Sequence, residues 1–386
     1  MLERKNQTPI HRPGVLFYQR TAIEKESPEQ YGYDKIKYNL SESSVTDLKL
    51  EDLSWDEKDL DLCYGDHLGY PELRKHIARQ ASGISPDQVL VTTGAAAALY
   101  IAATSLLKPG DHLVVLHPNY VTNIETPRAI GCRTDYLRLT FESGFRLDLD
   151  KLESLIKPET RIVSLTYPHN PTGMHIHEAE LKHIISLVEG AGCFLLLDET
   201  YREMTAGKPL PTAASLSRQA ISVSSCSKSF GLPGLRIGWL MTQDESLFET
   251  FLAAKEQIFI SNSVVDEKIA ARFFAQKGRI FPKIKSHISR NFQITKAWIE
   301  ASEFMEWVEP SAGCVCFPRI KESIPLDLDR FYALLLDKYK TLVGPGHWFE
   351  MDRRYMRIGY GWPTNEGLRD GLESTNRAIR EALNKK

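Results

Sequence analysis

Residue types that can do chemistry together follow several short apolar segments of this chain. Lys228 comes directly after Ser225-Cys226-Ser227, and Arg236 lies eight residues beyond the lysine. Asp198 ends the apolar run 193–198. In open α/β sheets ligands bind beyond the carboxyl ends of the strands, so we expect these side chains to share one rim.

Part of this set predicts a phosphate site. The helix expected from Ala95 begins with free backbone N–H groups and the positive end of its dipole. Glycine and alanine at that position let a phosphate approach the backbone, and hydroxyl and guanidinium groups can add further donors. The residues expected to hold a phosphate are Gly94, Ala95, Ala96, Ser225, Ser227 and Arg236.

Asp198 and Lys228 have complementary properties. An acid at the end of an apolar strand lies in a low dielectric and needs a partner, which a protonated ring nitrogen would provide. A lysine between small polar residues is placed for imine formation. Each alone has an ordinary interpretation, a solvated lysine and a helix cap. With the phosphate site, the pair matches the needs of pyridoxal 5'-phosphate (PLP).

The chain resembles the class I and II aminotransferases, which are PLP-dependent enzymes of fold type I, like aspartate aminotransferase. The resemblance covers roughly residues 38–380, and the order of several motifs carries it. These are Ser-x-Ser-Lys228 followed by Gly-Leu-Pro-Gly-Leu-Arg-Ile-Gly, then Asn170-Pro-Thr-Gly, Asp198-x-x-Tyr201 and Arg357-Ile-Gly. It implies a large domain with a mostly parallel seven-stranded sheet between helices, and a smaller α+β domain.

The resemblance also implies cofactor and catalytic roles. Lys228 is the Schiff-base lysine and the proton shuttle at the substrate Cα. Asp198 pairs with the pyridinium nitrogen. Tyr120 stacks on the ring, and Asn170 and Tyr201 hold its phenolic oxygen. A purely structural role for Tyr120 stays open, because tyrosines often only pack.

Further roles concern the substrate and a second subunit. Arg357 is implied to bind the substrate α-carboxylate, with Asn170 beside it. Tyr64 matches the family tyrosine that reaches the phosphate of the neighbouring subunit, which implies a homodimer, although it too could be structural. Glu42 stands in the segment 39–45, where many relatives have glycine or small apolar residues. It is either a solvent-facing acid or a group that recognises a cationic side chain such as a guanidinium.

The segment 39–45, with Tyr64-Gly65-Asp66 and the run 117–120, is also similar to the branch that includes capreomycidine synthase. Members of that branch cyclise or oxidise arginine derivatives. Three functions are therefore carried forward. The first is an aminotransferase that moves an amino group from an L-amino acid to a 2-oxo acid. The second is a PLP-dependent lyase, cyclase or oxidase acting on an arginine-like amino acid. The third is a PLP-binding regulator without catalysis, which is disfavoured because no helix-turn-helix pattern precedes the motifs.

Alternating apolar and amphipathic segments predict the elements that position these residues. Expected strands are 89–92, 112–116, 134–139, 161–166, 193–198, 221–225 and 236–240, the last antiparallel because its connection is short for a helical crossover. Expected helices are 71–78, 95–106 and 178–190. Beyond residue 245 we expect helices 247–274, 283–303 and 365–384 and short strands 308–309, 313–318 and 356–359. The predicted organisation is an arm and part of the small domain at 1–45, a PLP-binding domain at 46–285 and a small domain at 286–386.

Composition fits a globular enzyme. The chain has 386 residues, of which 42% are hydrophobic, and 48 basic residues against 50 acidic ones. This balance disfavours a generally basic nucleic-acid binder. There is no apolar run long enough to span a membrane and no secretion signal at the N-terminus, so a cytoplasmic protein is expected. Six scattered cysteines predict neither a disulfide framework nor a metal site.

Overall fold

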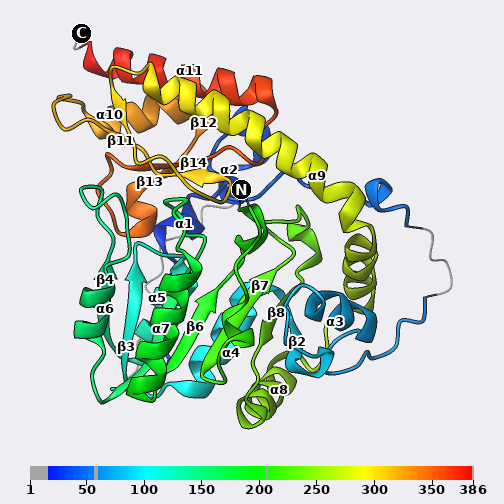
Figure 1. Ribbon diagram of the computed structural model, residues 1–386. Helices are drawn as coiled ribbons and strands as arrows, with labels where there is room; N and C mark the ends of the chain where they lie inside the picture. Colours follow the sequence, from blue (N-terminus) through cyan, green and yellow to red (C-terminus); the bar gives the residue numbers. More distant parts are fainter. Residues whose placement is uncertain (1–15, 56–59, 206, 385–386) are drawn as a thin grey trace.

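The computed structural model describes residues 16–55, 60–205 and 207–384. Figure 1 shows a large sheet with helices packed on it and a second region, in yellow to red, that contains α11 and the end of α9. The long helix α9 runs from one region to the other (Figure 1). The two regions meet above the sheet, where the strands end.

The large sheet has seven strands in the order β2-β8-β7-β6-β5-β3-β4. Its strands are β2 Val89–Thr92, β3 His112–His117, β4 Arg133–Arg138, β5 Thr160–Thr166, β6 Phe194–Asp198, β7 Ala220–Ser225 and β8 Gly238–Met241. Strand β8 runs antiparallel to the other six strands. The mostly parallel seven-stranded sheet is confirmed, and so is the antiparallel strand expected at 236–240, which is β8 and lies between β7 and β2.

Helices cover both faces of this sheet because alternate strand residues point to opposite sides. The helices are α3 Pro71–Ala78, α4 Gly94–Leu106, α5 Val121–Ile130, α6 Leu149–Leu155 and α7 Glu178–Ala191, followed by α8 Glu245–Phe259 and α9 Val264–Glu300. Leu90 and Leu240 pack with α4, α5 and α8. Val89 and Met241 face the other way, toward α3 and α9. The α6 and α7 helices cover that same face further along the sheet.

The break expected between the helices 247–274 and 283–303 is in the wrong place. The chain breaks between Phe259 and Val264, where Ile260 has a φ of 57° and Ser263 caps the next helix. From Val264 the helix continues to Glu300 through Pro282, which is exposed. A proline removes only one helical N–H, and packing along the rest of a long helix can compensate for that loss.

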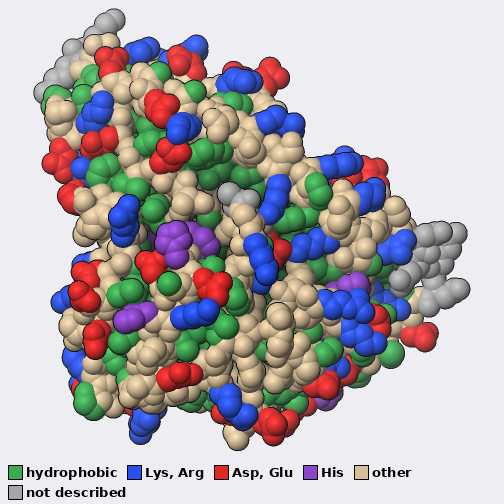
Figure 2. All heavy atoms as spheres, viewed as in Figure 1, with side chains coloured by type: hydrophobic (Ala, Val, Ile, Leu, Met, Phe, Trp, Pro, Cys, Tyr) green, Lys and Arg blue, Asp and Glu red, His purple; other side chains and the backbone are tan. Residues whose placement is uncertain are grey.

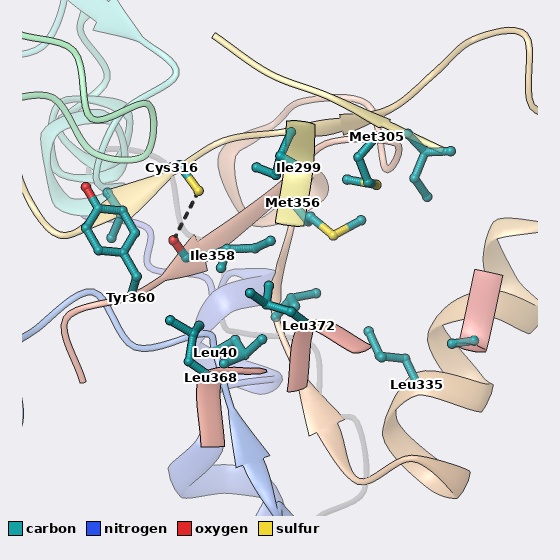
Figure 3. Packing of buried hydrophobic residues seen from close by; sticks show 14 of the residues in the cluster. Leu40, Ile299, Met305, Cys316, Leu335, Met356, Ile358, Tyr360, Leu368 and Leu372 are labelled. Carbon is teal, nitrogen blue, oxygen red and sulfur yellow. Dashed lines mark hydrogen bonds between the residues drawn. The ribbon is translucent and has the colours of Figure 1, made fainter. Parts of the chain in front are cut away.

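The second region is a smaller α+β unit around its own core. Its elements are β9 Met305–Glu306, β10 Val315–Cys316, β11 Arg319–Ile320, α10 Leu328–Ala333, β12 Thr341–Leu342, β13 Gly344–Pro345, β14 Met356–Gly359 and α11 Asn365–Leu383. The strand expected at 308–309 is wrong, because the pairing strand is β9, and the strand expected at 313–318 shortens to β10. Figure 3 shows Leu40 from the arm packed with Leu368 and Leu372 of α11.

The N-terminal arm is tied to this smaller unit. It contains α1 Ala22–Lys25, α2 Pro28–Tyr31 and β1 Tyr38–Asn39. Strand β1 pairs in parallel with β12, and the Gly359 N–H donates a hydrogen bond of 2.7 Å to the Leu40 carbonyl. The expected boundary at 285 falls inside the continuous helix α9.

The visible surface carries both signs of charge. Figure 2 shows lysine and arginine side chains interspersed with aspartate and glutamate on this face, without a single large patch of one sign. Among the helices of the described residues, none is long and apolar enough to cross a membrane. Nor do the described residues contain a group of three or more metal-ligating side chains placed to hold an ion.

Candidate active site

A cavity of about 320 Å³ opens where strands of the large sheet end, between the two regions. It brings together nearly all the residues singled out in the sequence. Those lining it are Glu42, Ala95, Ala96, Tyr120, Asn170, Asp198, Tyr201, Ser225, Ser227, Lys228, Arg236 and Arg357. Of the expected residues, Gly94 and Tyr64 do not line the cavity, although Gly94 directly precedes Ala95, which does. The volume suits a small ligand.

One end of the cavity is a set of donors for an anion. Gly94 opens α4 with a φ of 78°, and a Cβ there would lie 2.6 Å from a guanidinium nitrogen of Arg236. A Cβ on Gly238 would lie 2.5 Å from the Ala95 nitrogen. Both glycines are therefore required for Arg236 and β8 to approach the start of the helix. Arg236 also donates to Ser227 Oγ at 3.4 Å.

The carboxylate of Asp198 is buried in the middle of the site. It is 5% exposed, and burial raises its pKa above the ordinary value. Thr200 donates to Asp198 Oδ1 through its backbone N–H at 3.0 Å and its hydroxyl at 2.6 Å. These bonds offset part of the desolvation cost, yet among the described residues no cation lies within 4.0 Å of this acid. A bound group with a protonated nitrogen would complete its environment.

Lys228 extends from the loop after β7 into the same cavity. Burial lowers the pKa of its amine below the ordinary value, with Glu42 and Glu29 opposing the shift. A lower pKa gives a larger fraction of neutral amine, the form that attacks an aldehyde. The Val45 N–H donates to the Lys228 carbonyl at 3.2 Å, which ties this loop to the arm.

The smaller unit supplies a buried guanidinium to the opposite side. Arg357 on β14 is 4% exposed and donates to Asn170 Oδ1 at 3.1 Å and to the Ser41 carbonyl at 2.7 Å. Its Nε has no hydrogen-bond partner, although it is buried. An unpaired buried donor is costly, so a ligand carboxylate is the expected partner. Tyr201 is also buried beside this group, at 4% exposure.

The arrangement fits PLP. The donors at the start of α4 can bind the phosphate of PLP. Asp198, beside which the structure describes no cation, can pair with the protonated ring nitrogen, and the Lys228 amine can react with the aldehyde. Arg357 remains available for the carboxylate of an amino acid. A fold-type-I PLP enzyme is the class of protein that this fold and this set of residues define.

Comparison with known proteins identifies the family. The family model "Aminotransferase class I and II" matches residues 37–374, so the chain belongs to this family. The cofactor of this protein is pyridoxal 5'-phosphate, and the protein is a PLP-dependent aminotransferase.

Three similar proteins illustrate the range of the match. Capreomycidine synthase of Streptomyces vinaceus is 29% identical over 321 residues, which cover 83% of this chain and 80% of that protein. A PLP-dependent aminotransferase from Streptococcus suis 89-1591 superposes with a TM-score of 0.85 at 27% identity, covering 92% of this chain and 96% of the other. The PLP-dependent cyclase OrfR, in complex with Au, gives a TM-score of 0.85 at 26% identity, covering 98% and 99%.

Several residues of the cavity escaped the sequence analysis. Glu29 and Tyr33 come from the arm, and Trp348 comes from the short helix Gly346–Phe349. The Trp348 indole N–H donates to Glu26 of the arm at 2.7 Å. None of these residues belongs to a motif, and only the pairing of the arm with the smaller unit brings them to the site.

Proposed function

We propose that this enzyme transfers the amino group of an L-amino acid to a 2-oxo acid, with Lys228 as the residue that binds PLP covalently. The observation that carries the proposal is one cavity shared by Lys228, Asp198 and the anion site at the start of α4. These three features are separated in the sequence, and the fold brings them together at the rim where the strands of the large sheet end.

The residues divide the work. When bound, PLP withdraws electron density from the bonds at the substrate Cα. Asp198 would pair with the ring nitrogen and favour its protonated form. Lys228 would hold the cofactor through its amine, and Lys228 Nζ would accept the proton from the substrate Cα. Arg357 would hold the α-carboxylate, so that the Cα–H bond stays near Nζ. Tyr120, Asn170 and Tyr201 would hold the ring in the cavity.

A labelling experiment tests the role of Lys228. Borohydride reduction of the PLP-loaded enzyme should leave the pyridoxyl mass on the peptide that contains Lys228, read by mass spectrometry. The Lys228→Ala variant should lose the label and at least about 10²-fold in kcat, while retaining its fold by circular dichroism. Label on another lysine, or full turnover in the variant, contradicts the proposal.

A second candidate is cyclisation or elimination on an arginine-like amino acid. The match to the PLP-dependent cyclase OrfR, over 98% of this chain, and the similarity to capreomycidine synthase favour keeping it. The two reactions differ in their need for an acceptor. Transamination requires a 2-oxo acid for repeated turnover, whereas a cyclase turns over without one. Product analysis by mass spectrometry, with and without pyruvate, separates them.

We also infer a cytoplasmic homodimer. All six cysteines are free, which suits a reducing compartment. Tyr64 is 81% exposed and Leu62 is 79% exposed, and a second subunit would cover such side chains.

A further inference from the structure

The charged residues that line the active-site cavity fall into two groups. In the first group each charge has a counterpart on PLP or on the common core of an α-amino acid: phosphate, ring nitrogen, aldehyde and α-carboxylate. That group consists of Arg236, Asp198, Lys228 and Arg357. The second group is three carboxylates, Glu29 and Glu42 from the arm and Asp47 just after it, for which the cofactor and the amino-acid core offer no partner.

Two of these carboxylates flank one phenol. The Tyr33 hydroxyl lies 3.4 Å from Glu29 Oε1 and 3.3 Å from Glu42 Oε1. A hydroxyl carries one proton, so it satisfies one carboxylate at a time. Within the described part of the chain, no lysine, arginine or histidine lies within 4.0 Å of either glutamate. Glu42 Oε1 also accepts a long hydrogen bond of 3.5 Å from the Asn39 amide, and Asp47 accepts one of 2.9 Å from the Trp362 indole N–H.

The position of Glu42 is tied to that of Arg357. The Ser41 carbonyl accepts from Arg357, and the next residue is Glu42. On the same strand, Gly359 packs so closely that a Cβ would lie 1.6 Å from the Glu42 carbonyl. An amino acid held through its α-carboxylate at Arg357 therefore has its side chain beside the arm carboxylates. Glu29 and Glu42 line the same cavity as Lys228, so they share it with the reacting amine.

We infer that Glu29, Glu42 and the Tyr33 hydroxyl form the side-chain pocket of the amino donor and select a cationic group, a guanidinium or an ammonium. A guanidinium has five N–H donors in a planar fork and can bond two carboxylates together. The Tyr33 hydroxyl oxygen is then free to accept a hydrogen bond from the same cation. Glu42 is half-buried and Glu29 is exposed, so Glu42 is expected to contribute more. The inference rests on the proposed function for the position of the α-carboxylate.

The test compares L-arginine with L-citrulline, its neutral isostere. Binding of each to the PLP-loaded enzyme is measured by isothermal titration calorimetry, together with kcat/KM. Wild type should prefer L-arginine by about tenfold or more, and the double variant Glu29→Gln/Glu42→Gln should lose most of that preference. L-citrulline affinity should hardly change. Glu51→Gln is the matched control, because this exposed acid pairs with Lys49 outside the cavity.

Two results would overturn the inference: equal affinity of wild type for the two amino acids, or an undiminished preference for L-arginine in the double variant. If the double variant does not fold, the single variants must each show part of the loss, Glu42→Gln the larger part. The same titrations on PLP-loaded Lys228→Ala separate this inference from the proposed function. Loss of turnover in Lys228→Ala, with the preference for L-arginine retained, supports both the inference and the proposed function. Pyridoxyl label on another lysine of the wild-type enzyme refutes only the role proposed for Lys228.

Discussion

At the scale of single residues, two adjacent buried acids have different tasks. Asp198 is directed into the active-site cavity, while Glu199 accepts from the Ala213 N–H at 2.7 Å and from Ser222 Oγ at 2.8 Å. Burial raises the pKa of both carboxyls, that of Glu199 to about 7. Only the first is placed to act on a bound cofactor, because successive side chains near a strand end point to opposite sides.

The pair allows a matched comparison. Asp198→Asn should lower kcat by about 10²- to 10³-fold, since the amide cannot hold a charged ring nitrogen in a low dielectric. Glu199→Gln keeps its hydrogen bonds and should retain activity. Steady-state kinetics on both variants, with the PLP content measured, checks this. Equal losses would show that the Asp198 effect is structural.

The pH dependence of stability should also differ. The folded-state pKa of Glu199 lies above the unfolded value of 4.5, so its contribution is fully present below pH 4.5 and is lost as the pH rises through about 7. The contribution of Glu199 to the free energy of unfolding of wild type should thus decrease by roughly 3 kcal/mol between pH 4.5 and pH 8. Urea unfolding of Glu199→Gln should show a correspondingly smaller decrease. Identical pH profiles would contradict this assignment.

At the scale of elements, the junction between α8 and α9 is strained. Ile260 has a positive φ of 57°, a conformation that a β-branched side chain rarely adopts. It is 42% exposed, and Ile258, inside α8, is 50% exposed. Side-chain burial is therefore similar at the two positions, and the backbone differs.

Glycine substitution should have opposite effects at these two isoleucines. Ile260→Gly should raise the free energy of unfolding by about 1 kcal/mol, because glycine tolerates a positive φ. Ile258→Gly should lower it by up to about 1 kcal/mol, because glycine is a poor helix former. Urea denaturation of both variants decides the question. A destabilised Ile260→Gly would mean that the side chain has a packing role that outweighs the strain.

At the scale of the whole molecule, the site of one chain does not contain every residue that the motifs assign to it. Tyr64 is exposed and does not line the cavity. In the proposed homodimer it would contact the phosphate held by the other subunit. Each site would then combine Lys228 of one subunit with Tyr64 of the other.

Mixed dimers test this arrangement. Lys228→Ala and Tyr64→Ala homodimers should both have reduced activity, the second through weaker PLP binding. After the two are unfolded together and refolded, dimers with one chain of each type contain one intact site. The mixture should therefore recover activity above the sum of its parts. No recovery, with dimers confirmed by light scattering, would argue that Tyr64 acts within its own chain or not at all.

Local patterns determined most of the large sheet and its site. Apolar runs ending in Asp198 or in Ser225-Cys226-Ser227-Lys228 are strands followed by polar loops, and parallel strands carry such loops to one rim. The seven strands were therefore predictable within one or two residues. The break at Ile260 and the strand β9 were not, because a backbone strained at one isoleucine and a two-residue pairing leave no periodic signal.

Only the tertiary structure placed the arm. The segment that contains Glu29 and Tyr33 has no motif, yet the pairing of β1 with β12 and the contact of Ser41 with Arg357 bring it to the cavity. Those contacts join residues about 300 positions apart, and the local spacing of residues in the sequence does not predict which distant segments meet. The chemistry of the cofactor site is thus readable from the chain itself, whereas the surroundings of the substrate side chain follow from how the two regions pack.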